Sequence, residues 1–199
     1  MKRILCGILI AAVTAAATVL LSSYFSTADT LNRIVNQDGY RITVQVEKPV
    51  DITIEKALLP DDFPADADVE VSFDENQIVL HQTETTTLYL EQICGWQDND
   101  SLFFAFDFSY KLPQSGVILL PYRMNLDEDG NTESVTNSLR TDCVELRDAT
   151  RSFPGAVAPR GFGPSQKFTV HVDREAFASA EEFLSFRLDG FTELTYEQR

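Results

Sequence analysis

The amino-acid sequence predicts an all-β fold, an antiparallel β-sandwich that follows a hydrophobic N-terminal helix. Two observations indicate the sandwich. From residue 39 onward apolar and polar residues alternate with a period of two, and turn signals separate the alternating runs at short intervals. Room remains for only one short helix between strands, which argues against an α/β fold because that fold needs long crossover helices. A small closed barrel is the alternative architecture.

The first 28 residues have the pattern of an export segment. Lys2 and Arg3 form a short positive region, and the uncharged run Ile4–Leu21 follows them. Small residues at Ser26–Ala28 precede Asp29, as at a signal-peptide cleavage site. As a helix the apolar run would reach roughly 27 Å, enough to cross a bilayer core. The sequence therefore predicts either a cleaved signal peptide or a membrane anchor at residues 1–28, and a polar linker at residues 29–38.

The first strands are expected near the start of a β-sandwich domain at residues 39–199. Alternation before and after Pro49 predicts one bent or edge strand. The side chains expected to face the core are those of Ile42, Val44, Val46, Val50, Ile52 and Ile54.

The central segment predicts a hairpin with an aromatic core strand. A strand at residues 88–93 is followed by a polar turn at residues 97–100 and a strand at residues 102–110. Phe104, Phe106 and Phe108 are expected at the centre of the core, and the alternate residues of that strand are expected to face outward. Asp129-Gly130 predicts a second tight hairpin turn.

The last third of the chain predicts two more strands, a short helix and a loop. Residues 168–172 and 184–188 alternate, and Asp173 can cap a helix at residues 174–180 between them. The segment at residues 148–163 has no periodicity and is rich in Pro, Gly, Arg and Ala, which favours a long surface loop.

Four segments carry a resemblance to a known family: Leu102–Tyr110, Leu126–Asn131, Phe153–Gly155 and Phe168–Val172. In this order they resemble the small immunoglobulin-like extracytoplasmic domains of Gram-positive secreted proteins and lipoproteins of unassigned function. The resemblance covers residues 80–190, and Lys111-Leu112-Pro113 stands where those domains usually have an asparagine-rich segment. It implies an immunoglobulin-like sandwich and an extracytoplasmic location, with no catalytic residues.

The formal net charge of −15 narrows the classes of partner. Nucleic acid and anionic lipid both require a basic surface, and no Lys/Arg cluster follows the N-terminal segment. We therefore expect no nucleic-acid partner, and contact with a membrane only through residues 1–28. A charge of this size fits a soluble domain that is exposed to the medium.

Two cysteines, Cys94 and Cys143, follow the export segment. An even number of cysteines outside the cytoplasm makes a Cys94–Cys143 disulfide a candidate. The alternative is that both are small buried side chains.

Few residues offer catalytic chemistry. His81 and His171 are the only histidines, and the metalloprotease, serine-hydrolase and dithiol motifs HExxH, GxSxG and CxxC are absent. Asp127, Asp129 and Asn131 match the start of a calcium loop, but its later glycine and glutamate positions hold Thr132 and Ser138. We therefore expect no catalytic, cofactor-binding or metal-binding residues.

Two functions remain as expectations. The favoured one is a non-catalytic extracytoplasmic binding or interaction module at the bacterial cell envelope, with an envelope protein or a glycan as partner. Tyr89, Trp96 and Tyr110 are the aromatic side chains that could stack on a sugar, and the alternative for Trp96, two residues after Cys94, is packing in the core beside a disulfide. The alternative is a secreted carbohydrate-active hydrolase with a carboxylate site, which would require two carboxylates facing each other across a cleft.

Overall fold

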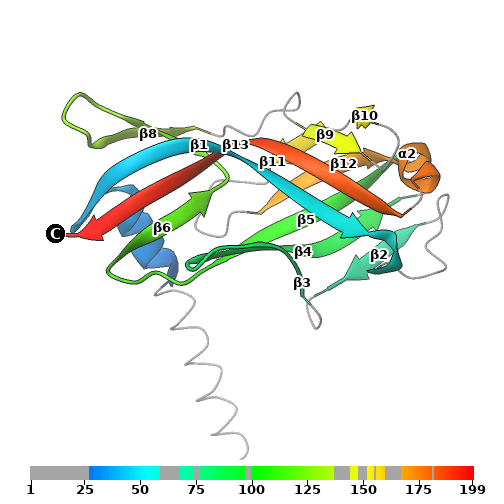
Figure 1. Ribbon diagram of the computed structural model, residues 1–199, viewed down its shortest axis with the longest axis horizontal. Coiled ribbons are helices and arrows are strands. Elements are labelled where there is room, and N and C mark those ends of the chain that lie inside the picture. The colour runs from blue at the N-terminus through cyan, green and yellow to red at the C-terminus, as the bar shows by residue number, and fades with distance from the viewer. Residues whose placement is uncertain are drawn as a thin grey trace, which may run out of the picture.

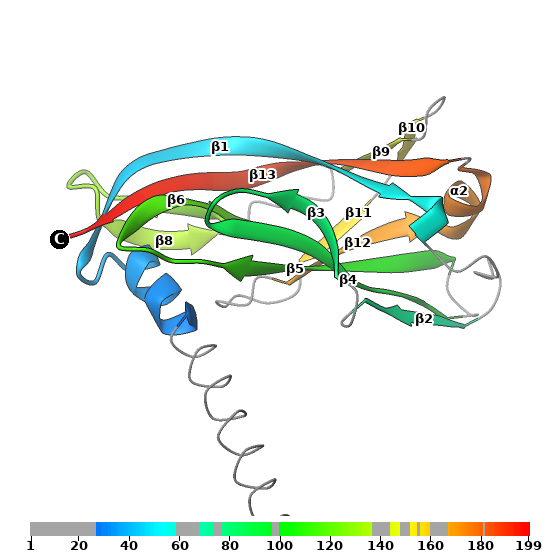
Figure 2. The ribbon, with the colours of Figure 1, turned by 60° about the horizontal axis from the view of Figure 1, so that its bottom comes forward.

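The computed structural model describes residues 27–58, 68–73, 77–96, 100–136, 144–147, 152–154, 156–159, 167–180 and 182–199. Two antiparallel sheets face each other, with short helical segments at the ends (Figures 1 and 2). The all-β class that the sequence predicts is therefore confirmed. Residues 1–26 of the predicted export segment lie outside the described residues, so that segment stays a prediction.

Two helices are described, one at residues 27–35 and α2 (Arg174–Ser179), together with one 3-10 turn, η1 (Lys56–Leu58). The strands are β1 (Tyr40–Glu55), β2 (Val69–Ser72), β3 (Ile78–Gln82), β4 (Thr86–Gly95), β5 (Ser101–Tyr110), β6 (Ser115–Leu120), β7 (Arg123–Leu126), β8 (Thr132–Thr136), β9 (Val144–Arg147), β10 (Ser152–Pro154), β11 (Ala156–Pro159), β12 (Phe168–Asp173) and β13 (Phe183–Gln198).

The first sheet has the order β1-β13-β9-β10, and β6 pairs with the C-terminal half of β13. The second sheet has the order β11-β12-β5-β4-β2, and β3 also pairs with β4. Strands β7 and β8 form a separate hairpin. Because β1 pairs with β13 from Tyr40 opposite Gln198 to Glu55 opposite Phe183, residues 40–55 belong to the same sandwich as the rest.

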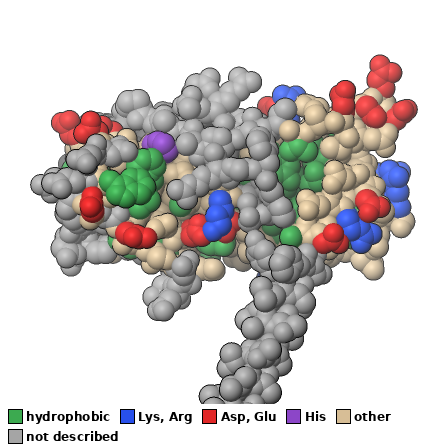
Figure 3. Space-filling view, turned by 180° about the vertical axis from the view of Figure 1, so that it is seen from behind, with side chains coloured by type: hydrophobic (Ala, Val, Ile, Leu, Met, Phe, Trp, Pro, Cys, Tyr) green, Lys and Arg blue, Asp and Glu red, His purple; other side chains and the backbone are tan. Residues whose placement is uncertain are grey.

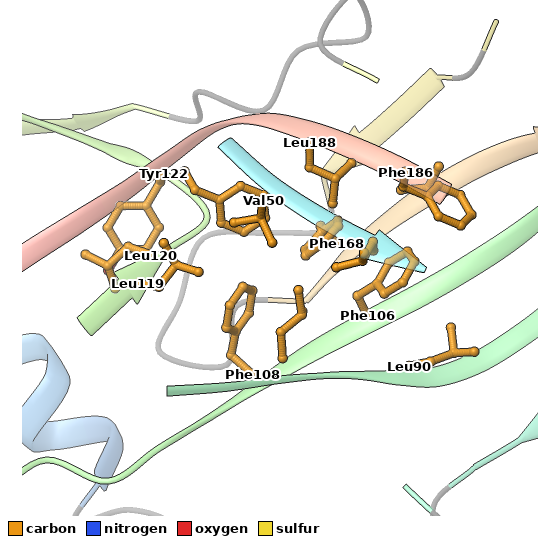
Figure 4. Close-up of a cluster of buried hydrophobic side chains, with 14 of the residues drawn as sticks. Val50, Leu90, Phe106, Phe108, Leu119, Leu120, Tyr122, Phe168, Phe186 and Leu188 are labelled. Carbon is orange, nitrogen blue, oxygen red and sulfur yellow. The ribbon is translucent and has the colours of Figure 1, made fainter. Parts of the chain in front are cut away.

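Aromatic side chains from both sheets fill the space between them. Phe104 and Phe106 of β5 have no exposed surface, and Phe108 is also buried, as predicted. The ring of Phe106 stacks on Phe168 at 5.0 Å and meets Phe186 of the first sheet edge-on at 6.1 Å. Figure 4 shows these rings pointing toward one another between the sheets. Burial of such rings is the main source of stability in this fold.

The predicted facing of the first half of β1 is wrong. Val44 and Val46 are 49% and 51% exposed, and Gln45 points inward, where its amide donates to the carbonyl of Met124 at 2.6 Å. A β-bulge between Ile42 and Val44 causes this, because one extra residue reverses the side of every residue after it. A second irregularity at Pro49 restores the predicted facing, and Val50, Ile52 and Ile54 are buried.

Side chains of β4, of β5 and of the turn before β4 cover the edge of β6. The hydroxyl of Thr85 donates to the carbonyl of Val117, and the hydroxyl of Tyr110 donates to the carbonyl of Leu119 at 3.2 Å. The Leu119 N–H donates to the hydroxyl of Thr86 at 3.1 Å. Backbone groups that would form an open strand edge are therefore satisfied within the chain. Tyr110 serves this closure, and burial raises its pKa well above its ordinary value.

Residues 29–35, predicted as part of a linker, are instead helical and packed on the sandwich. Leu31, Ile34 and Val35 are buried in the core, at the i, i+3, i+4 spacing of a helix that buries one face. The Thr132 hydroxyl of β8 donates to the carbonyl of Val35 at 2.5 Å, and the Gln37 amide donates to the carbonyl of Gly130 at 2.6 Å. The helix therefore closes one end of the sandwich.

The two predicted hairpins are present as β4–β5 and β7–β8, and α2 begins at the predicted residue. In the second hairpin only Gly130 has a positive φ, of 80°, which indicates a type I turn followed by a left-handed glycine. The predicted surface loop at residues 148–163 is wrong in part, because it contains β10 and β11. These strands are too short for periodicity to reveal, and their prolines suit strands at the sheet edges.

Candidate functional site

The most distinctive surface of the described residues is the outward face of the second sheet, here called the outer face. Strand register places its side chains in three rows across β2, β4, β5 and β12. The first row is Glu70, Cys94, Phe103 and His171, the second is Ser72, Gln92, Ala105 and Thr169, and the third joins Tyr89 and Asp107. Figure 3 shows this side of the molecule.

An exposed aromatic ring lies next to the first row. Trp96 follows β4 and is 52% exposed, and its ring meets Phe103 edge-on at 5.2 Å. Phe103 in turn meets the His171 ring at 4.4 Å. His171 is outward-facing, as predicted, but it packs against a ring instead of standing alone in solvent. Through Phe103 these three side chains form a continuous aromatic surface on the outer face.

Buried contacts hold the backbone of Trp96 in place. The Arg174 side chain, which is almost fully buried, donates to the Trp96 carbonyl at 2.9 Å, and the Arg174 N–H donates to the Asp100 carbonyl at 2.9 Å. The lack of a side chain at Gly95 lets Leu102 and Arg174 pack directly against β4. A Cβ atom there would lie 2.7 Å from Leu102 Cδ2 and 2.8 Å from Arg174 Nη2. The position of Trp96 is therefore set by the packing beneath it.

We expect Gly95→Ala to disturb Trp96 more than the rest of the fold. The added methyl group must displace Leu102 or Arg174, and such overpacking costs about 1–3 kcal/mol. Trp96 is the single tryptophan of the chain, so its emission spectrum reports directly on this position. The spectrum of the folded variant should shift toward that of the unfolded chain. Gly130→Ala is the control, because its strain comes from the positive φ of the β7–β8 turn and not from crowding near Trp96: a Cβ there meets no atom within 4 Å. An unshifted spectrum for Gly95→Ala, or an equal shift in both variants, would contradict this account.

The third row carries a charged network. The Lys167 ammonium pairs with the Glu91 carboxylate and lies 3.5 Å from Asp107 Oδ2. Asp107 also accepts hydrogen bonds from the Tyr89 hydroxyl at 3.2 Å and from the Phe108 N–H at 2.7 Å. A register shift between Leu90 and Gln92 makes Glu91 the extra residue of a β-bulge in β4. Two carboxylates thus share one ammonium group.

Burial affects the pKa values of Asp107 and Lys167. It raises the pKa of the Asp107 carboxyl above its ordinary value, against the opposing effects of the Phe108 hydrogen bond and the Lys167 charge. Burial alone would lower the pKa of Lys167. The hydrogen bond to Glu91 and the charge of Asp107 outweigh it, so that pKa is raised and the ammonium stays charged.

The raised pKa of Asp107 gives a pH dependence of defined sign. The folded chain binds the Asp107 proton more tightly than the unfolded chain does, so this group adds stability at low pH that is lost as the pH rises through its folded pKa. Urea unfolding of the protein and of Asp107→Asn should be compared at about pH 7 and about pH 4.5. We expect the unfolding free energy of the unsubstituted protein, relative to that of Asp107→Asn, to be greater at the lower pH than at the higher pH. A move in the opposite direction would mean that the fold stabilises the carboxylate.

His81 lies elsewhere, where β3 of the second sheet meets β1 of the first. Its Nε2 atom is buried without a hydrogen-bond partner among the described residues. Burial and the charge of Lys48 lower its pKa, while Glu193, which pairs with Lys48, raises it. His81 therefore belongs to the junction between the sheets and not to the outer face.

The remaining residues that the sequence analysis singled out are the two cysteines and the calcium-loop carboxylate Asp127. Cys94 is buried on β4, but Cys143 lies outside the described residues, so the disulfide stays a prediction. Asp127 Oδ1 accepts hydrogen bonds from the backbone N–H groups of Asp129 and Asn131, so its carboxylate organises its own turn. Those bonds lower the pKa of Asp127.

The sequence did not single out Glu91, Asp107 and Lys167. The sequence signal that could have revealed this network is Asp107, a charged residue within a strand of aromatic residues. A charged residue is buried only when it has charged or hydrogen-bonding partners, so its position predicts that such partners lie nearby. Its partners could not be identified from the sequence, since they come from β4 and from the residue before β12.

Among the described residues no group of three or more His, Cys, Asp or Glu side chains is placed to hold a metal ion. Neither of the described helices has the length and apolar character needed to cross a membrane. No family model matches the chain, and no curated protein or solved structure matches it at a significant level. The resemblance to immunoglobulin-like domains therefore stays a prediction.

Proposed function

We propose that this chain is a non-catalytic binding or interaction module at the bacterial cell envelope and that it binds its partner through the outer face. The observation that supports this most is Trp96, which is exposed at 52% although the contacts of Arg174 and Phe103 hold it in place. Exposed and preorganised aromatic residues are the usual anchors of recognition surfaces, because little conformational entropy is lost when a partner covers them.

The charged network of the third row favours a binding function over a catalytic one. Glu91 and Asp107 share one ammonium group, and Asp107 has further hydrogen bonds from Tyr89 and the Phe108 backbone. Such a network fixes the orientation of polar groups on a surface without requiring a substrate to complete it. A partner that contacts it would meet donors and acceptors in set positions.

The location is part of the same proposal. Residues 1–28 would act as a signal peptide or a membrane anchor and place the sandwich outside the cytoplasm. The sandwich itself would have an immunoglobulin-like arrangement of its strands. The helix at residues 27–35 packs on the sandwich, so an uncleaved anchor would hold the domain close to the membrane surface. Mass measurement of the native protein separates cleavage after Ala28 from anchoring.

The alternative function is a carbohydrate-active hydrolase, and one observation favours it. Asp107 has a raised pKa and lies near a second carboxylate, Glu91, as a general acid would. Against it, the Lys167 ammonium pairs with both carboxylates, so a cation lies where a glycosidic bond between them would have to lie. Hydrolysis of a glycan that is lost in both Glu91→Gln and Asp107→Asn, with the fold intact, would establish the alternative.

A capture experiment tests the proposed function. The full chain is immobilised and exposed to envelope material that has been separated into protein and glycan fractions. We expect a component to bind, to be recovered chemically unchanged, and to bind at least about tenfold less to Trp96→Ala. Val117→Ala is the matched control, because Val117 is also exposed and apolar but lies on the first sheet. Equal loss in both variants, or release of cleaved products, would overturn the proposal.

A further inference from the structure

Carboxylates surround the aromatic end of the outer face. Glu70 of β2 is exposed and lies opposite Cys94 in the register, in the row of Phe103. Asp173 of β12 is exposed and lies opposite Ser101, beside the exposed Asp100, whose carbonyl accepts a hydrogen bond from Arg174. In Figure 3 acidic side chains lie around the hydrophobic side chains next to a histidine at this end of the face.

Among the described residues, the two basic side chains that flank β12, Arg174 and Lys167, have partners elsewhere. Arg174 is almost fully buried, and its guanidinium donates to the Trp96 carbonyl. Lys167 belongs to the third row, four residues along β5 from Phe103, roughly 13 Å away at the rise of an extended strand. The other described charges around the aromatic surface are carboxylates, within a chain whose net charge is −15.

We propose that this acidic aromatic patch, defined as Trp96, Phe103 and His171 with Glu70, Asp100 and Asp173, binds a basic segment of a partner protein. The inference rests on the proposed function and names the partner class. Tryptophan is the ring that attracts a guanidinium or ammonium group most strongly, through the negative face of its π system. Carboxylates beside it add charge-assisted hydrogen bonds, and the negative field of the whole chain speeds the approach of a positive partner.

The spacing of the carboxylates fits a peptide with several basic side chains. Glu70 lies on β2 and Asp173 on β12, with β4 and β5 between them, so three strand spacings of about 4.8 Å separate the two strands. One ammonium group cannot reach both carboxylates, but a segment that crosses the strands over Trp96 can place one basic side chain at each end. A neutral sugar would gain only the aromatic contact, and an acidic glycan would be repelled.

Fluorescence of the single tryptophan tests this inference on the full chain. The probes are a short peptide of alternating arginine and glycine, the same peptide with glutamate in place of arginine, and a neutral glucose hexasaccharide. We expect only the arginine peptide to change Trp96 emission in a saturable way. Its affinity should fall about tenfold or more when salt is raised from about 20 mM to about 200 mM, because exposed charges are screened.

Two double variants separate the patch from the overall charge. Glu70→Gln with Asp100→Asn removes two charges of the patch, and should lower the affinity for the arginine peptide about fivefold or more. Glu128→Gln with Glu133→Gln removes two exposed charges on the β7–β8 hairpin, and should leave the affinity within about twofold.

Three outcomes would overturn the inference. They are an equal loss of affinity in both double variants, no saturable response to the arginine peptide, or a response to the hexasaccharide alone. In the last case the proposed function would stand with a glycan as its partner, whereas capture unaffected by Trp96→Ala would remove the proposed function itself.

Discussion

Replacing Phe106 by alanine is expected to lower the free energy of unfolding by about 3–5 kcal/mol, because the site cannot collapse around the lost ring. Phe106 has no exposed surface and touches both sheets, stacking on Phe168 at 5.0 Å and meeting Phe186 at 6.1 Å. A loss of this size is a large part of the stability of a typical domain. Urea denaturation followed by circular dichroism measures it.

Phe103→Ala is the matched control for this prediction. It removes the same side chain from the same strand, but on the outer face, where Phe103 is only half-buried. We expect it to cost clearly less than Phe106→Ala, about 1–2 kcal/mol for a partly buried ring. A greater loss for Phe103 than for Phe106 would mean that β5 turns its other side to the core.

The second large effect is expected at the N-terminal helix. Leu31 is 1% exposed within the core cluster, and Leu31→Ala should cost about 2–5 kcal/mol because it leaves a cavity at the closed end of the sandwich. The neighbouring Asn32 is exposed, and Asn32→Ala should change stability by less than about 0.5 kcal/mol. Both variants are compared by urea denaturation. Equal stability of the two would mean that residues 27–35 are a tether and not part of the fold.

Alternation predicted the strands well where one face of a strand is wholly buried. Phe168, Val170 and Val172 of β12 and Leu184, Phe186 and Leu188 of β13 face the core as expected, since in these strands the period of two is unbroken. It failed at β1, where a bulge reversed the side of Val44 and Val46. A bulge here leaves no signal in the sequence, because Thr43 is as compatible with a regular strand as with an irregular one.

The helix at residues 27–35 was missed for a different reason. Its three buried residues have helical spacing, but the segment is short, and its polar residues between an apolar run and the first strand favoured a linker. Helical stability here comes from packing on the sandwich, which only the three-dimensional arrangement reveals.

The candidate site could be predicted only in part. The outward face of His171 follows from the sequence, which leaves Trp96 either as a side chain that stacks on a sugar or as a core residue. The contact of both rings with Phe103 depends on the pairing of β12 with β5, which joins residues far apart in the chain. The same holds for the Glu91–Lys167–Asp107 network. Local pattern places side chains on faces, whereas strand order decides which of them become neighbours.

Oxidative footprinting of the full chain with and without its captured envelope partner tests most directly whether the outer face is the binding surface. Trp96 on the second sheet and Val44, Val46 and Val117 on the first are all exposed in the free protein, so both faces are reactive. We predict that the partner protects Trp96 and leaves the three valines as reactive as before. Protection of Val44, Val46 and Val117 with Trp96 unprotected would contradict the account and place the binding surface on the first sheet.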